Sequence, residues 1–305
     1  MRDCLGVSPG EELLVVCDPG TRALAERLRD EGERLGADAV LTLMEERATS
    51  GTEPPAAIGA AMAAAHAVLA PTTQSLSHTA ARKAATDAGV RIATLPGVTE
   101  ELLARVMSAD MEGLRRKGRA VAGMLSAGSE AHLSSETGSD LRMSLEGRTA
   151  IPDAGELTEP GAFGNLPCGE GFIAPVEGTA NGTLVVDGSI AAIGKVSAPV
   201  TLRVEGGHLV EALGEEGAAF MKILETAGAG GTNVAELGIG TNEKATLTGN
   251  VIEDEKLLGT AHVAFGASAA IGGTVQVPIH LDCVVLRPTV EIDGQAVVRD
   301  GELLA

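Results

Sequence analysis

Strand-like and helix-like segments alternate through the first 107 residues, and this order constrains the fold more than any other feature of the chain. Short apolar runs with the character of buried strands lie at 12–18, 39–43, 67–70 and 90–94. Helical patterns separate them at 21–35, 57–65 and 75–88. Parallel strands need a crossover connection, which is usually a helix. Repeated strand–helix units therefore predict an α/β domain with a parallel sheet covered by helices on both faces.

The turn after the first strand carries no nucleotide-binding signature. It reads Asp18-Pro19-Gly20-Thr21, which matches neither the Gly-x-Gly-x-x-Gly fingerprint nor a phosphate-binding loop. A doubly wound fold alone specifies no activity. We therefore assign no nucleotide cofactor to this domain.

The pattern changes beyond residue 129, where short apolar runs are separated by glycine-containing turns. Asp-Gly or Gly-Gly pairs supply the positive φ of tight turns and predict hairpins at 185–190, 202–210 and 290–297. One helix interrupts the strands near 217–227. We therefore predict an α/β doubly wound domain at 1–107, a helical connector at 108–128, and a mostly β (α+β), antiparallel or mixed domain at 129–305.

The composition excludes partners that need a basic or aromatic surface. The chain has 23 Lys and Arg against 42 Asp and Glu, a net charge of −19, and no Trp or Tyr. Such a surface repels nucleic acid and anionic membranes, and it offers few rings for base stacking. The most apolar stretch, 56–70, is shorter than the ~20 residues of a membrane-spanning helix. We therefore expect no nucleic-acid partner and no membrane partner.

The cysteines and the N-terminal residues favour a cytoplasmic protein. The four cysteines are far apart and form no Cys-x-x-Cys pair, so we expect neither a disulfide framework nor a zinc ribbon. The first residues lack a basic segment followed by an apolar run. Both observations fit a reducing compartment.

Near the C-terminus a hydrophobic strand, 277–286, contains a His-x-Asp pair. Residues two apart on a strand point to the same face, so His280 and Asp282 emerge side by side. Burying an imidazole and a carboxylate together is costly unless something binds them. A divalent metal would do so. A core histidine hydrogen-bonded to its neighbouring aspartate is the alternative, and the pair alone does not decide between the two.

Three further segments place carboxylates or a histidine in apolar, glycine-rich surroundings. They are 165–175 with Glu170, 235–242 with Glu236, and 253–266 with Glu255 and His262. Glycine beside a carboxylate lets the backbone bend and approach a ligand closely. His262 has small residues, Thr260 and Ala264, on its own face of the strand, with Val263 and Phe265 on the other. Small neighbours leave room for a metal ion beside the imidazole.

Four motifs together resemble the aminopeptidase T family of metallo-aminopeptidases, the thermophilic leucyl aminopeptidase type. They are Pro-x-Gly-Glu at 167–170, Glu-x-Gly-x-Gly-Thr-Asn at 236–242, Gly-Thr-x-His-x-Ala at 259–264 and His-x-Asp at 280–282. In the first domain, the segments 73–82 and 95–97 look like this family as well. The resemblance extends over most of the chain and suggests a short, divergent member.

The resemblance implies a site and an activity. The family's metal ligands fall on Glu170, Glu236, His262, His280 and Asp282, with Glu255 as an additional carboxylate. Such a site would hold two divalent ions (zinc, cobalt or manganese) around a water that attacks the scissile carbonyl. Glu236 or Glu255 would take the proton as general base. The resemblance therefore implies a homodimeric aminopeptidase-like hydrolase whose β-rich metal-binding catalytic domain removes N-terminal residues from short peptides.

The chain departs from the aminopeptidases in a feature that bears on the reaction. Those enzymes carry a catalytic tyrosine several residues past the histidine that matches His262. Here the stretch 266–270 contains none, and the chain has no tyrosine at all. The spacing between His262 and His280 is also shorter than in the peptidases.

Two other functions remain open on the same scaffold. The chain also resembles the 2,5-dihydroxypyridine dioxygenases, which open an aromatic ring with Fe(II) held by two histidines and one aspartate. His262, His280 and Asp282 supply that set, which is the facial triad of non-haem iron oxygenases. A catalytically inactive metal-binding relative is the third alternative. We favour the hydrolase, because aromatic contacts for a planar diol are scarce in a chain with four Phe.

Overall fold

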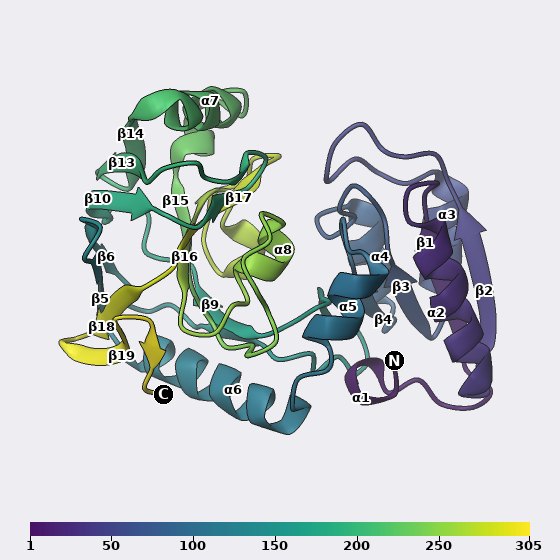
Figure 1. The fold of residues 1–305 in the computed structure, drawn as a ribbon. Coiled ribbons are helices and arrows are strands. Elements are labelled where there is room, and N and C mark those ends of the chain that lie inside the picture. The colour runs from purple at the N-terminus through teal and green to yellow at the C-terminus, as the bar shows by residue number, and fades with distance from the viewer. The chain divides into compact units, whose positions relative to one another are not determined.

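A computed structural model describes residues 1–305, and the chain divides into two compact units (Figure 1). The first unit comprises Met1–Met107 with Gly155–Cys168, and the second comprises Ser108–Ala154 with Gly169–Ala305. Each unit has its own hydrophobic core. No helix is both long and apolar enough to cross a membrane.

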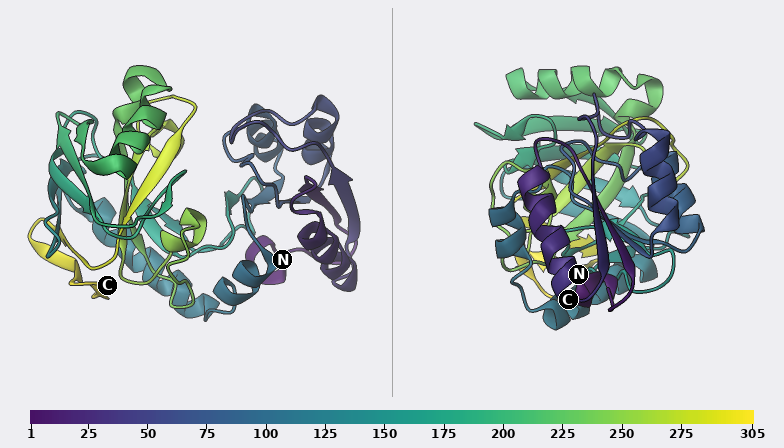
Figure 2. Two further views of the ribbon diagram at one scale, coloured as in Figure 1. Left: turned by 45° about the horizontal axis from the view of Figure 1, so that its top comes forward. Right: turned by 90° about the vertical axis from the view of Figure 1, so that its right-hand side faces the viewer.

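The first unit is built on a five-stranded parallel sheet with the order β2-β1-β3-β4-β8. Its strands are β1 (Glu12–Cys17), β2 (Asp38–Leu43), β3 (Ala67–Ala70), β4 (Arg91–Thr94) and β8 (Phe163–Asn165). Its helices are α1 (Arg2–Leu5), α2 (Arg22–Arg34), α3 (Ala56–Ala64), α4 (Ala80–Asp87) and α5 (Glu100–Val106). Helix α2 covers one face of the sheet, while α3 and α4 cover the other (Figure 2). Right-handed crossovers require this arrangement when the strand order reverses, and the predicted α/β fold is confirmed.

One strand of this sheet comes from far along the chain. β8 pairs in parallel with β4, which places Thr94 opposite Asn165. The Thr94 hydroxyl donates to Oδ1 of Asn165 at 2.6 Å, and the Ser77 hydroxyl donates to the same oxygen at 3.2 Å. The segment Gly155–Cys168 therefore belongs to the first unit and not to the β-rich domain predicted at 129–305. A strand of three residues is too short to show a periodic pattern, so the sequence alone does not reveal it.

The second unit consists of two antiparallel sheets with helices packed on them (Figure 1). The eight-stranded sheet runs, in spatial order, through β14 (His208–Ala212), β13 (Val200–Glu205), β10 (Asn181–Val186), β6 (Asp140–Ser144), β5 (Glu130–Ser135), β18 (Pro288–Ile292), β19 (Gln295–Arg299) and β20 (Glu302–Leu303). The seven-stranded sheet runs through β12 (Gly194–Lys195), β11 (Ser189–Ile190), β17 (His280–Val285), β16 (Ala261–Gly266), β15 (Val234–Gly240), β9 (Glu170–Ile173) and β7 (Ile151–Asp153). The helices are α6 (Met111–Ala127), α7 (Gly214–Glu225) and α8 (Val251–Asp254). The predicted mostly β, antiparallel region is confirmed.

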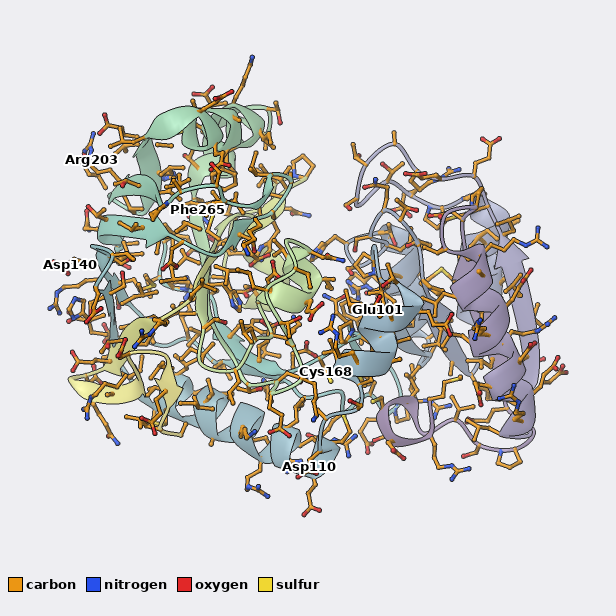
Figure 3. The ribbon with its side chains drawn as sticks, in the orientation of Figure 1. Glu101, Asp110, Asp140, Cys168, Arg203 and Phe265 are labelled. Atoms are coloured by element: carbon orange, nitrogen blue, oxygen red, sulfur yellow. The ribbon has the colours of Figure 1, made fainter.

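Alternation along β16 separates a core face from a polar face. Val263 and Phe265 join the hydrophobic core of the second unit, which contains residues of both sheets. Phe265, labelled in Figure 3, packs edge-on against Phe220 of α7, with ring centroids 5.9 Å apart. Because side chains alternate along a strand, His262 points to the opposite face of the sheet. The predicted division of this strand is confirmed.

Two of the three predicted hairpins are confirmed, and one is wrong. β13 pairs with β14, and β18 pairs with β19. The segment 185–190, in contrast, connects two strands, β10 and β11, that belong to different sheets. Gly188 N donates to Val284 O at 3.1 Å, and Oδ1 of Asp187 accepts from Leu286 N at 2.9 Å. Hydrogen bonds to β17 and the residue after it thus replace the cross-strand bonds of a hairpin, and the Asp-Gly pair carries the chain from one sheet to the other.

Candidate metal centre

The five predicted ligands come from four neighbouring strands of the seven-stranded sheet. They are Glu170 at the start of β9, Glu236 in β15, His262 in β16, and His280 and Asp282 in β17. In β15, β16 and β17 the residue directly after a ligand joins the core: Leu237 follows Glu236, Val263 follows His262, and Cys283 follows Asp282. The ligands therefore project together from the face of the sheet that is turned away from the core.

Glu236 lies at the centre of this cluster and faces both histidines. Its Oε1 is 3.1 Å from Nε2 of His262, and its Oε2 is 3.4 Å from Nε2 of His280. Two groups of ligand atoms share it, each with its atoms within 4.8 Å of one another: Glu170, Glu236 and His262 in one, and Glu236, His280 and Asp282 in the other. The structure thus brings all five predicted residues together.

Some nitrogen and oxygen atoms of the cluster lack a hydrogen-bond partner, as expected where a cation binds. Nε2 of His262 lies 3.1 Å from a carboxylate oxygen of Glu170 and from one of Glu236, although a ring nitrogen carries at most one hydrogen. Glu170 Oε2 and His262 Nδ1 are buried without a hydrogen-bond partner. His280 donates from Nδ1 to the carbonyl of Ala267 at 2.7 Å, which leaves its Nε2 available as a ligand. Imidazole and carboxylate donors that converge in this way suit a divalent metal.

Two glycines of β15 make room for the cluster. Gly238 lies opposite His262 on the neighbouring strand, and a Cβ at this position would come within 2.0 Å of the imidazole Nε2. At Gly240 a Cβ would come within 2.1 Å of the carbonyl oxygen of Leu257. The Glu-x-Gly-x-Gly motif therefore reflects two close approaches, one by a side chain and one by the backbone.

Two charged residues beside the cluster, Lys256 and Asp153, do not stand out in the sequence. The Lys256 ammonium is 1% exposed and donates to Oε1 of Glu170 at 2.5 Å and to Oε1 of Glu255 at 2.6 Å. Oδ2 of Asp153 lies 3.5 Å from it. Glu255 therefore contacts Lys256 and belongs to neither group of ligand atoms. The available signal is a single lysine directly after the acidic run 253–255, within an apolar, glycine-rich segment.

Burial and mutual charge shift the pKa values of these groups strongly. Burial raises the pKa of Glu255 to about 8 and that of Asp153 to about 7, although the Lys256 ammonium opposes both shifts. Burial alone would lower the pKa of His262, but the carboxylates of Glu170 and Glu236 beside its Nε2 raise it well above the usual value. Binding of a metal to this imidazole must therefore displace a proton.

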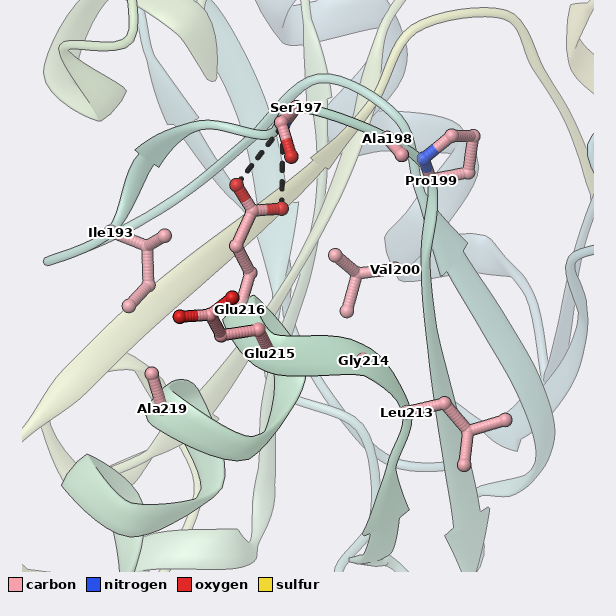
Figure 4. A pocket seen from close by; sticks show the side chains of 10 residues that line it. All are labelled: Ile193, Ser197, Ala198, Pro199, Val200, Leu213, Gly214, Glu215, Glu216 and Ala219. Carbon is pink, nitrogen blue, oxygen red and sulfur yellow. Dashed lines mark hydrogen bonds between the residues drawn. The ribbon is translucent and has the colours of Figure 1, made fainter.

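A cavity elsewhere in the second unit lies at the start of α7 (Figure 4). Its volume is about 470 Å³, and its lining includes Ile193, Pro199 and Leu213. The carboxylate of Glu216 lies there and accepts from Ser197 N at 3.1 and 3.3 Å. No predicted site residue lines this cavity, so it is distinct from the metal centre.

Comparison with known proteins decides the family. A model of the 2,5-dihydroxypyridine 5,6-dioxygenase (NicX) family matches residues 2–305. The chain belongs to the NicX family. The 2,5-dihydroxypyridine 5,6-dioxygenase of Pseudomonas putida strain KT2440 is 26% identical to it over 254 residues, which cover 76% of the chain and 70% of that relative.

Two solved structures share the fold of this NicX-family chain. The structure of 2,5-dihydroxypyridine dioxygenase from Pseudomonas putida KT2440 matches it with a TM-score of 0.84 at 22% identity, covering 98% of this chain and 93% of that one. Wild-type AmpT from Thermus thermophilus matches with a TM-score of 0.72 at 19% identity, covering 100% and 97%. At such identities the likeness shows the fold alone.

The predicted aminopeptidase function is wrong. The NicX match over nearly the whole chain and the curated dioxygenase relative overturn the assignment as a hydrolase, aminopeptidase or metalloprotease. The likeness to AmpT is one of fold. The ligand motifs belong to a scaffold that occurs in both kinds of enzyme, so they do not specify the reaction. The absent tyrosine is the feature of the sequence that points away from a peptidase.

Proposed function

We propose that the protein is an Fe(II)-dependent 2,5-dihydroxypyridine 5,6-dioxygenase. Membership of the NicX family supports the reaction type. The observation that carries the proposal is the convergence of His262, His280 and Asp282 around one carboxylate on a single face of one sheet. Two histidines and one carboxylate with open positions form the ligand set of non-haem Fe(II) oxygenases.

The chain's own residues have distinct roles in this proposal. His262, His280 and Asp282 would hold the metal, and the hydrogen bond to the Ala267 carbonyl orients the His280 ring. When bound, Fe(II) would supply open coordination positions and a route for electrons from the hydroxylated ring, which is oxidised, to O₂.

Glu236 is our choice for the group that takes a proton from a substrate hydroxyl. Its two oxygens lie 3.1 and 3.4 Å from Nε2 of His262 and His280, so the carboxylate would lie beside a metal held by these rings, and in its ionised form it only accepts protons and hydrogen bonds. Glu255, the other predicted base, is engaged by the ammonium of Lys256 at 2.6 Å. This contact makes Glu255 the weaker choice.

Differences in exposure suggest from which side the substrate arrives. The side chains of His262 and Glu236 are 0% and 7% exposed, whereas those of His280 and Asp282 are 20% and 13% exposed. Within the second unit, the more accessible edge of the cluster is thus β17. A substrate ring that enters over His280 would leave the buried His262 side of the cluster without water, and the exclusion of water strengthens electrostatic interactions there.

The test is disappearance of 2,5-dihydroxypyridine in the presence of O₂ and protein loaded anaerobically with Fe(II). Wild-type protein is expected to turn over the substrate, and His280→Ala is expected to lose activity by at least about 100-fold, because a proposed metal ligand is removed. His208→Ala is the matched control, because His208 contacts Thr232 and lies on β14, an edge strand of the eight-stranded sheet, whereas the cluster lies on the seven-stranded sheet. Lack of turnover by wild-type protein with confirmed bound iron would contradict the proposal.

A further inference from the structure

Lys256 is a buried cation surrounded by three carboxylates. Its ammonium contacts Oε1 of Glu170 at 2.5 Å, Oε1 of Glu255 at 2.6 Å and Oδ2 of Asp153 at 3.5 Å. Burying an ammonium costs several kcal/mol unless its partners are well placed. This arrangement therefore needs a frame that holds the lysine and its partners in register.

The backbone supplies such a frame. Asn242 N donates to the carbonyl oxygen of Lys256 at 2.8 Å, and Lys256 N donates to Glu253 O at 2.9 Å. Gly240 permits the close approach of the 256–257 backbone to β15. On the other side, Asp153 and Glu170 are direct cross-strand partners of β7 and β9. Lys256 thus lies in a turn that backbone hydrogen bonds tie to the end of β15, and strand pairing fixes its partners Asp153 and Glu170.

The two oxygens of Glu170 face different partners. Oε1 accepts from Lys256, while Oε2 lies 3.1 Å from Nε2 of His262 and accepts no hydrogen bond. We propose that Lys256 is a positioning residue: it fixes Oε1 of Glu170 so that Oε2 is turned towards His262 and Glu236 as a metal ligand. This role rests on the metal site of the proposed function and adds Glu170 to its three ligands. It concerns how the site is held and not which substrate it takes.

A purely electrostatic role makes the opposite prediction. Five carboxylates lie in or beside the cluster, namely Asp153, Glu170, Glu236, Glu255 and Asp282, and Lys256 is their one ammonium partner. If Lys256 served only to offset charge, its removal would make the cluster more negative and strengthen the binding of a divalent cation. If it positions Glu170, its removal frees that carboxylate to rotate and weakens binding, as losses of outer-shell partners do.

The experiment is titration of Co²⁺ into the chelator-treated full-length protein, followed by the visible absorption of the bound ion. Lys256→Met is expected to raise the Kd for Co²⁺ by about 10- to 100-fold and to change the absorption spectrum, because the ligand geometry changes. In a Glu170→Gln background the same substitution should add little, since the oxygen that it positions is no longer a carboxylate. Lys117→Met, which removes a lysine paired with Glu243 on the surface of the same unit, is the matched control.

A second variant separates the hydrogen bond from the charge and serves where Lys256→Met does not fold. Lys256→Gln keeps an N–H donor for Glu170 without the charge, so it is expected to recover part of the Co²⁺ affinity. Unchanged or tighter Co²⁺ binding in Lys256→Met would overturn the proposal, as would an equal loss with and without Glu170→Gln. Where Lys256→Met does not fold, Lys256→Gln that binds Co²⁺ more tightly than wild-type protein would overturn it. Wild-type protein that binds Co²⁺ as expected but leaves 2,5-dihydroxypyridine intact would contradict the proposed function alone.

Discussion

Glu177 anchors the loop between β16 and β17, and its replacement by glutamine is expected to destabilise the second unit. Oε1 of Glu177 accepts from Thr274 N at 2.6 Å and from the Ser268 hydroxyl at 3.1 Å. Its other carboxylate oxygen pairs with Arg148, which also donates to the carbonyl of Gly272. One carboxylate and its partner therefore fix this loop at three points, Ser268, Gly272 and Thr274.

The magnitude follows from the pKa of the Glu177 carboxyl. Burial would raise it, but hydrogen bonds from its own amide, from Thr274 and from Ser268 prevail and lower the pKa from 4.5 to about 2. A depression of this size corresponds to about 3 kcal/mol of folding free energy. Because the folded-state pKa is the lower one, this stabilisation is complete above pH 4.5 and is lost as the pH falls towards 2.

Urea denaturation of wild-type protein and Glu177→Gln tests this value. At about pH 7 the variant is expected to lose up to about 3 kcal/mol of unfolding free energy, and the difference should shrink to less than half by about pH 3. Glu225→Gln, on an exposed position of α7, is the control and should change stability by less than about 0.5 kcal/mol. A loss that is equally large at both pH values would refute the electrostatic reasoning. The loop also carries the Ala267 carbonyl that orients His280, so weaker metal binding should accompany the loss.

Two further predictions concern the metal centre. Gly238→Ala is expected to abolish Co²⁺ binding in equilibrium dialysis, because the new methyl group would meet the His262 imidazole. Gly123→Ala is the control, since a Cβ at that position meets nothing within 4 Å. Wild-type affinity in Gly238→Ala would contradict the assigned geometry. Affinity for Co²⁺ should rise with pH by up to about tenfold per unit for each proton displaced, because carboxylate partners raise the pKa of His262 and His280 against the effect of burial. A Kd that is the same at about pH 6 and about pH 8 would show that the metal does not displace these protons.

The fold of the first unit is predictable where its signals are local. The strand at Ala67–Ala70 is a continuous apolar run, and its limits in the structure are those of the pattern. Helix α4 begins at Ala80 and not at 75, because the Thr79 hydroxyl caps it by accepting from Arg82 N at 3.2 Å. β8 is not predictable in this way, since its three residues are strand only by virtue of pairing with β4.

The candidate site shows the same division between local and distant signals. Alternation along β16 and β17 predicts that His262, His280 and Asp282 leave the core face, and the structure places all three around Glu236. The contact of Lys256 with Asp153 and Glu170 depends on the pairing of segments about 100 residues apart, which no local pattern encodes. The motifs do not determine the reaction either, because the same types of metal-ligand residue serve hydrolytic and oxidative chemistry.

The most direct test of the central claim is to run the reaction of Fe(II)-loaded protein with 2,5-dihydroxypyridine under ¹⁸O₂ and to measure the mass of the product. A ring-opening dioxygenase places both atoms of O₂ in its product, so the account predicts a product that carries two ¹⁸O atoms, with a parallel reaction under ¹⁶O₂ in ¹⁸O-labelled water as the control for exchange. A product with no label from ¹⁸O₂, or no product at all from protein with confirmed bound iron, would contradict the account.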